Sequence, residues 1–131
     1  MVQVIDAHAI MALLEKEPCH EKVEQFLISA EQNEKNMLLS SVNFGEVYYI
    51  VLREHGFAKA SEIEKTILSL PIDIINVDIL IAKEAGRFKA FYKMSYADCF
   101  AAALAKINNA QLITGDKEFK AVEKEIKIAW L

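Results

Sequence analysis

The chain has 131 residues, of which 53% are hydrophobic, and it contains only four glycines and two prolines. This composition excludes a disordered, fibrous or low-complexity protein, and the length suits one domain with its own core. Nineteen acidic against 15 basic residues give a net charge of −4, which argues against a protein that binds polyanions through general basicity. A nucleic-acid enzyme is compatible with this charge, because divalent cations held by acidic side chains can reverse the local sign.

No segment has the pattern of a membrane span or an export signal. The longest apolar runs have the length of strands and are interrupted by charges, and the first ten residues lack a basic segment followed by a long apolar one. Two cysteines and three histidines are scattered without the spacing of a zinc site, so we expect packing or surface roles for them. These patterns predict a cytoplasmic protein with a single domain over residues 1–131.

Short apolar runs alternate with longer helical patterns along the whole chain. Strands are expected at 2–5, 37–41, 72–75, 111–114 and, with an alternation of period two, 126–130. Helices are expected at about 9–15, 21–31, 44–55, 58–69, 78–92, 96–107 and 117–123. Alternating strands and helices predict a mainly parallel sheet with right-handed crossovers. The expected fold is therefore an α/β protein, a three-layer α/β/α sandwich around five strands, with the last strand at an exposed edge.

Four acidic residues lie where predicted strands end or the following helices begin: Asp6, Glu46, Asp98 and Asp116. In open parallel sheets the functional groups collect at the carboxyl ends of the strands, so we expect these four side chains at one edge. Four carboxylates in one place repel one another unless cations lie between them. Hard oxygen ligands suit Mg²⁺ or Mn²⁺, and two such ions about 3.5–4 Å apart can promote phosphodiester hydrolysis.

Each of these acids also has a structural interpretation. Asn43 lies three residues before Glu46, which is the spacing of a capping box at a helix start. Ser95 and Asp98 repeat this spacing, and the other two acids could each be an N-cap. At this point both interpretations, metal ligands and helix caps, are open.

Other catalytic motifs are missing from the sequence. It has no GxGxxG after a strand, no GxxxxGK[ST] and no GxSxG, which removes the dinucleotide, P-loop and serine-hydrolase interpretations. A receiver-like signalling domain fits the length and the alternation of elements. It would need an acidic pair after the first strand, whereas Asp6 is followed by Ala7 and His8.

Four segments together resemble the PIN-domain ribonucleases, in particular the VapC-type toxins of type II toxin–antitoxin pairs. They are VIDAHAIMALLEKEP, SSVNFGEVYYIV, KMSYADCFAAALAK and LITGDKEF, in the order and spacing of that family. The resemblance runs nearly end to end, and it places the family's acidic quartet on Asp6, Glu46, Asp98 and Asp116. It implies that the three aspartates ligate metal, that Glu46 does so directly or through water, and that Thr114 forms hydrogen bonds within the site.

The resemblance implies a metal-dependent endoribonuclease that uses Mg²⁺ or Mn²⁺ and is held inactive by a cognate antitoxin. The alternative is a catalytically silent PIN-like RNA-binding or scaffold protein, but all four acids are present. Two departures concern the first motif, where Ala7 replaces the Ser or Thr of many relatives and His8 follows it. Glu118 stands where relatives often have a second acid. Together with Thr114, it is a candidate for a supporting role around the ligands.

The sequence also contains candidate contact surfaces. Lys89, Lys93 and Lys117 lie near the acidic motifs and, with His8, are candidates for RNA contact, although each lysine could simply be solvated. Residues 47–52 are six apolar residues in a row, more than the stripe with which a surface helix covers a core. Such a helix is either fully buried or forms a second contact, and the resemblance favours an interface with the antitoxin, a homodimer, or both.

Overall fold

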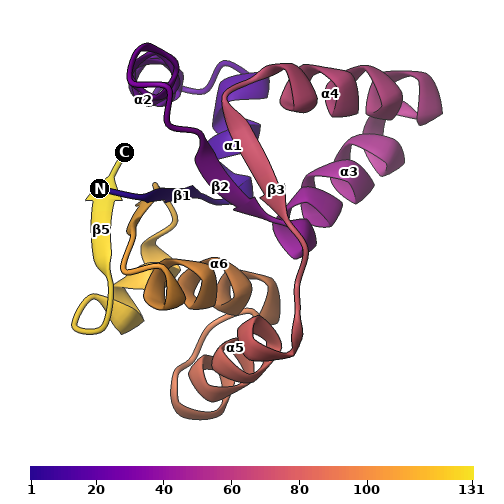
Figure 1. Ribbon diagram of the computed structural model, residues 1–131. Helices are drawn as coiled ribbons and strands as arrows, with labels where there is room; N and C mark the ends of the chain where they lie inside the picture. The colour runs from indigo at the N-terminus through magenta and orange to yellow at the C-terminus, as the bar shows by residue number, and fades with distance from the viewer.

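The computed structural model describes residues 1–131 and contains one five-stranded sheet with helices on both faces (Figure 1). The strands are β1 (Gln3–Ile5), β2 (Met37–Ser40), β3 (Ile72–Ile75), β4 (Gln111–Thr114) and β5 (Lys127–Trp130). All of them are parallel, in the order β3-β2-β1-β4-β5. Because β1 is central and β4 is its neighbour, the residues that follow these two strands lie side by side at the carboxyl edge.

The helices follow the strands in the predicted order. They are α1 (Ala7–Leu14), α2 (His20–Gln32), α3 (Ser41–His55), α4 (Phe57–Ser69), α5 (Ile79–Phe91), α6 (Tyr96–Ile107) and the short 3-10 helix η1 (Lys117–Val122). The three-layer α/β/α sandwich predicted from the sequence is therefore confirmed, with a wholly parallel sheet and β5 at its edge. None of the helices combines the length and the apolar character that a membrane crossing requires.

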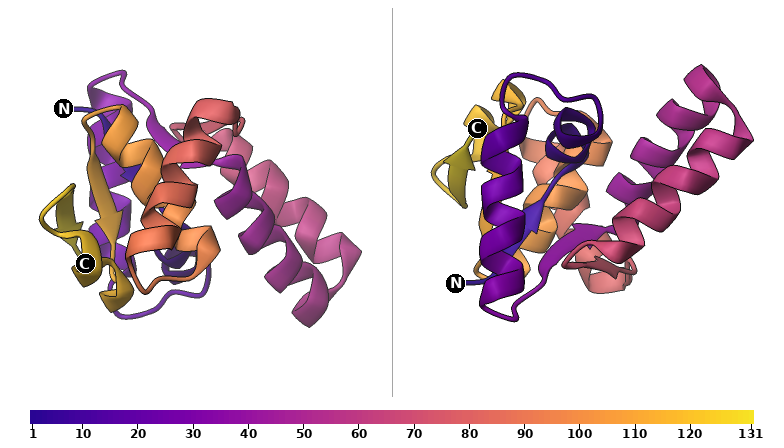
Figure 2. Two further views of the ribbon diagram at one scale, coloured as in Figure 1. Left: turned by 90° about the horizontal axis from the view of Figure 1, so that it is seen from below. Right: turned by 90° about the horizontal axis from the view of Figure 1, so that it is seen from above.

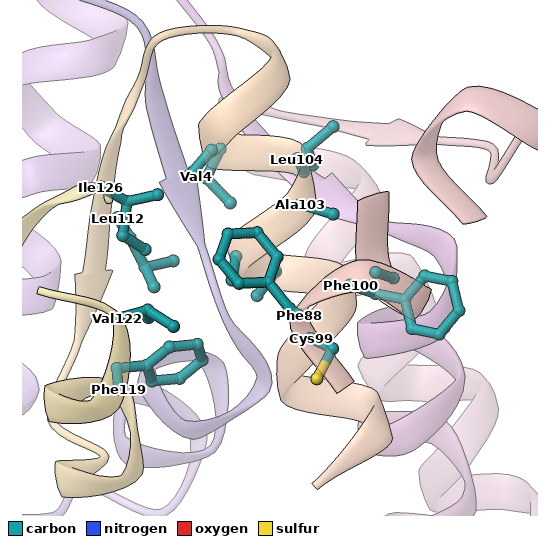
Figure 3. Close-up of a cluster of buried hydrophobic side chains, with 14 of the residues drawn as sticks. Val4, Phe88, Cys99, Phe100, Ala103, Leu104, Leu112, Phe119, Val122 and Ile126 are labelled. Atoms are coloured by element: carbon teal, nitrogen blue, oxygen red, sulfur yellow. The ribbon is translucent and has the colours of Figure 1, made fainter. Parts of the chain in front are cut away.

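Two hydrophobic clusters cover the two faces of the sheet. In the first, α5, α6 and η1 pack against one face, with Phe88 and Phe119 fully buried between them and the strands (Figure 3). In the second, α1 to α4 pack against the other face. Val4 belongs to the first cluster and Ile5 to the second, because successive side chains of a strand point to opposite faces. The central strand is thus buried on both sides and holds the carboxyl edge in a fixed position.

Helices α3 and α4 form an antiparallel pair that projects from the rest of the molecule (Figure 2). Gly56 alone separates the two helices, and its φ of 87° lies in the left-handed region that favours glycine. Val47 and Val51 of α3 are buried against the second cluster, whereas Tyr49 is 50% exposed. The apolar run at 47–52 is therefore only partly buried within the chain. Of the two alternatives for this helix, full burial is excluded and a second contact remains.

The two phenylalanines of α5 provide a matched test of the first cluster. Phe88 is fully buried and Phe91 is 77% exposed. We expect Phe88→Ala to lower the free energy of unfolding by about 3–5 kcal/mol, because it removes buried contacts and leaves a cavity. Phe91→Ala should change it by about 0.5 kcal/mol or less. Urea denaturation of both variants measures the difference, and equal losses would contradict this packing.

Candidate functional site

Asp6 directly follows β1 and lies at the centre of the carboxyl edge. Its Oδ1 accepts a hydrogen bond from the backbone N–H of Ala9 at 2.8 Å, and its Oδ2 accepts one from Thr114 Oγ1 at 2.5 Å. Asp6 is only 1% exposed, and this burial raises the pKa of its carboxyl to about 6 although both hydrogen bonds lower it. Asp6 is thus the N-cap of α1 and, at the same time, a buried carboxylate at the edge of the sheet.

Three further acids form a tight group beside it. One carboxylate oxygen from each of Asp98, Asp116 and Glu118 lies within 4.8 Å of the others. Asp98 is in the first turn of α6, and the other two begin the turn and 3-10 helix after β4. Burial and, second, the charge of Asp116 raise the pKa of the Asp98 carboxyl to about 8. The fold therefore holds these charges together at an electrostatic cost to the metal-free protein.

Glu46 approaches the group from α3. Its Oε1 accepts a hydrogen bond from Asn43 Nδ2 at 3.5 Å, and Glu46 lines a pocket of about 250 Å³ together with Asp98, Asp116 and His8. Burial raises the pKa of the Glu46 carboxyl, the Asn43 bond lowers it, and Asp116 raises it further. The structure thus brings all four acids of the predicted quartet to one edge, with Glu46 outside the tight group of three.

The capping box predicted for Asn43 and Glu46 is wrong. Helix α3 begins at Ser41, because Ser40 at the end of β2 is its N-cap and accepts a hydrogen bond from Val42 N at 3.1 Å. Asn43 is therefore inside the helix and fully buried, and its Nδ2 donates to Ala97 O at 3.1 Å. This bond joins α3 to the start of α6, a role that the sequence analysis missed. Its only sequence signal is an amide side chain within a largely apolar segment.

The second predicted capping box is only half formed. Ser95 is the N-cap of α6, and its Oγ accepts a hydrogen bond from Asp98 N at 3.3 Å. The reciprocal bond from Ser95 N does not go to Asp98, because Glu118 Oε1 accepts it. The Asp98 side chain is consequently not used as a cap. The sequence did not indicate this contact, which joins residues 23 positions apart.

The other candidate residues differ in their surroundings. His8 lines the pocket, and its Nδ1 is buried without a hydrogen-bond partner. Its ring lies against Gly115, where an added Cβ would come within 2.8 Å of His8 Cε1, so a larger residue there would displace the ring. Lys89, Lys93 and Lys117 are all exposed, and Lys89 Nζ donates to Met94 O at 2.6 Å. Of the four candidates for RNA contact, His8 therefore lies deepest in the site.

The donor set fits a hard divalent cation. All of the clustered ligand atoms are carboxylate oxygens, which are the ligands that Mg²⁺ and Mn²⁺ prefer. None of the salt bridges in the structure involves these acids, so no lysine or arginine neutralises their charge. Burial raises the pKa values of the Asp6, Glu46 and Asp98 carboxyls, and the nearby Asp116 raises them further.

Residues 4–125 match the family model of the PIN domain. The chain belongs to the PIN domain family. Over 127 residues it is 25% identical to the VapC ribonuclease Mb0640 of Mycobacterium bovis, an alignment that covers 89% of this chain and 92% of that protein. The expectation that the chain resembles this family is confirmed.

Solved structures support the same fold. VapBC2 from Rickettsia felis, bound to a DNA fragment from its promoter, is similar with a TM-score of 0.81 and 18% identity, covering 98% of both chains. A toxin–antitoxin complex from Klebsiella pneumoniae is similar with a TM-score of 0.71 and 20% identity, covering 98% of this chain and 96% of that one. At these identities the similarity concerns the PIN fold.

The raised pKa values predict how stability depends on pH when metal is absent. The pKa values of Asp6 and Asp98 are about 6 and about 8 in the folded protein, against an ordinary 3.8. Between the ordinary pKa of 3.8 and the raised values of about 6 and about 8, the folded protein binds more protons than the unfolded chain. Its stability therefore falls as pH rises through this range. Glu125, whose pKa its bonds to Arg87 and Tyr92 lower to about 2, titrates below this range.

We therefore expect the EDTA-treated protein to melt at a lower temperature at about pH 8 than at about pH 5. Asp98→Asn removes the carboxyl with the higher pKa and should make this dependence shallower. Exposed Asp73, which accepts a hydrogen bond from Asn36, provides the control variant Asp73→Asn. Calorimetric melting curves measure the effect, and a slope unchanged by Asp98→Asn would contradict the assignment.

Proposed function

We propose that this protein is a metal-dependent endoribonuclease, the toxin of a VapBC-type toxin–antitoxin pair. One observation carries the proposal: four carboxylates meet at the carboxyl edge of a PIN-domain sheet, and no basic side chain forms a salt bridge with them. The similar Mycobacterium bovis protein is named a ribonuclease, which agrees with this chemistry. We expect residues 1–131 to act as a single PIN-like nuclease domain in the cytoplasm, with RNA as the substrate.

In this proposal Asp6, Asp98 and Asp116 hold Mg²⁺ or Mn²⁺, and Glu46 contacts it directly or through water. The bound cation supplies Lewis-acid activation of water and stabilises charge on the leaving oxygen. Thr114 orients two ligands at once, because its Oγ1 donates to Asp6 Oδ2 and accepts from Asp116 N at 3.0 Å. The Thr114 hydroxyl thereby holds the Asp6 carboxylate and the backbone of Asp116 in place relative to each other.

Glu46 is suited to a second task in the same site. It lies outside the tight group of three, and burial raises the pKa of its carboxyl. Glu46 lines the same pocket as Asp98 and Asp116, and from this position its ionised carboxylate can take the proton of the attacking water. Asn43 Nδ2 contacts Oε1 of this side chain at 3.5 Å.

A catalytically silent RNA-binding or scaffold protein is the alternative. Such a protein has no use for four crowded acids whose repulsion lowers its stability. Its RNA-binding surface would also be expected to be basic, whereas this chain has a net charge of −4. We therefore favour the enzyme.

The activity is tested directly with purified protein and single-stranded RNA. Cleavage should require Mg²⁺ or Mn²⁺ and stop in EDTA. Asp98→Asn keeps the shape of the side chain but removes a ligand charge, so it should slow cleavage by about 100-fold or more. Asp73→Asn again provides the control and should cleave like the wild type. Full activity in EDTA, or an unaffected Asp98→Asn enzyme, would refute the proposal.

We also propose that the exposed side of the α3–α4 pair forms an interface, with a cognate antitoxin, a second copy of the chain, or both. The similar Klebsiella pneumoniae structure is a toxin–antitoxin complex. On this pair, Tyr49, Phe57 and Leu68 are large apolar side chains that are at least half exposed. Large apolar side chains that are exposed on a projecting element are typical of surfaces that contact other proteins.

Light scattering tests the homodimer. We expect the wild type to be a dimer and Tyr49→Glu to shift it towards monomer, because the change places a charge at an apolar contact. Glu54→Gln is the control, because it changes the charge of another exposed residue of α3 without placing a charge at Tyr49. It should leave the dimer intact. A wild-type monomer at high protein concentration would exclude the homodimer and leave the antitoxin as the partner to test by co-purification.

A further inference from the structure

We propose that Glu118 is a positioning residue, which keeps the Asp98 carboxylate available to the metal by accepting the Ser95 N–H that Asp98 would otherwise cap. The inference rests on the proposed function, because it concerns how the same acidic site is assembled. It assigns Glu118 a role other than that of a further metal ligand.

The start of α6 shows the competition. In a complete capping box the N-cap side chain accepts from the backbone N–H of the third helical residue, whose own side chain accepts from the N-cap N–H. Ser95 and Asp98 have the required identities and spacing, and the first of these bonds is present at 3.3 Å. The second is replaced, because Glu118 Oε1 takes the Ser95 N–H. An acid from another element thus completes the cap in place of Asp98.

The backbone of Glu118 is held in place, although its side chain is partly exposed. Its backbone N–H donates to Asp116 Oδ1 at 3.0 Å, and Asp116 N donates to Thr114 Oγ1 at 3.0 Å. The next residue, Phe119, is fully buried in the first cluster (Figure 3). The Glu118–Ser95 bond therefore joins two rigid segments, the turn after β4 that carries Asp116 and the helix that carries Asp98.

Loss of this bond has a specific consequence for Asp98. Its carboxylate lies within 4.8 Å of the Asp116 carboxylate, whose charge repels it and remains when Glu118 is removed. The free Ser95 N–H at the positive end of the α6 dipole would attract it instead. In Glu118→Ala we expect Asp98 to turn back and complete its own capping box, which withdraws it from the metal site.

The first arm of the test uses metal-free protein and follows the Ser95 amide by NMR, through its proton shift and hydrogen exchange. The wild type and Asp98→Ala should both keep the hydrogen bond, because Glu118 accepts it. Glu118→Ala should also keep it, now through Asp98, and only the double variant Glu118→Ala with Asp98→Ala should lose it. Loss of the bond in Glu118→Ala alone, to the same degree as in the double variant, would overturn the competition between the two acids.

The second arm measures Mn²⁺ affinity by calorimetry. Glu118→Ala should weaken binding by about 10–100-fold, the usual effect of removing a group that orients a metal ligand. Glu118→Gln keeps an oxygen acceptor for Ser95 N and should bind Mn²⁺ nearly as the wild type does. Glu123→Ala removes the same charge from an exposed position at the end of η1 and serves as the control. With RNA, Glu118→Ala should need more Mn²⁺ for half-maximal rate, and Glu118→Gln should not.

Two results would overturn the role. If Glu118→Gln weakens Mn²⁺ binding as much as Glu118→Ala while the Ser95 amide is unchanged, Glu118 is a ligand. If the double variant keeps the Ser95 hydrogen bond and Glu118→Ala binds Mn²⁺ as the wild type does, the bond has no positioning effect. A wild type that binds no Mn²⁺ would refute the proposed function, whereas the metal-free arm would still decide whether Glu118 and Asp98 compete.

Discussion

Repulsion among carboxylates at one edge of the sheet is the constraint on which the rest of the site depends. Asp98 and Asp116 lie close together, and the burial of Asp98 leaves little water to screen its charge. Burial and, second, the charge of Asp116 raise the pKa of the Asp98 carboxyl. A protein can sustain such repulsion only if its fold is stable without the site, and here two hydrophobic clusters on either face of the sheet supply that stability.

The topology determines which acids meet. Since β1 and β4 are neighbours, Asp6 and Asp116 follow adjacent strands, and the Thr114 hydroxyl bridges them. The other two acids come from helices and need separate connections. Asn43 joins α3 to the start of α6, and the Glu118–Ser95 bond joins α6 to the turn after β4. Each acid is thus placed by a polar contact that lies outside the quartet itself.

Helix caps and candidate metal ligands are difficult to separate at this edge of the sheet. A helix start at the carboxyl edge needs an acceptor for its free N–H groups, and the same edge needs acids for a cation. Asp6 and Asp116 do both, because each caps a helix with one carboxylate oxygen while the side chain stays at the site. Asp98 does not, because its capping bond is made by another residue.

The sequence by itself determined the order and type of the elements, the parallel sandwich and the four acids, because apolar periodicity and strand ends are local features. It placed α6 and β3 at their observed limits, but it started α3 three residues late, since the cap at Ser40 overlaps the end of β2. Only the tertiary structure decided which acceptor each N–H of the helix starts would use. That choice depends on residues far apart in the chain, such as Ser95 and Glu118, whose proximity is created by packing and leaves no periodic signal in the sequence.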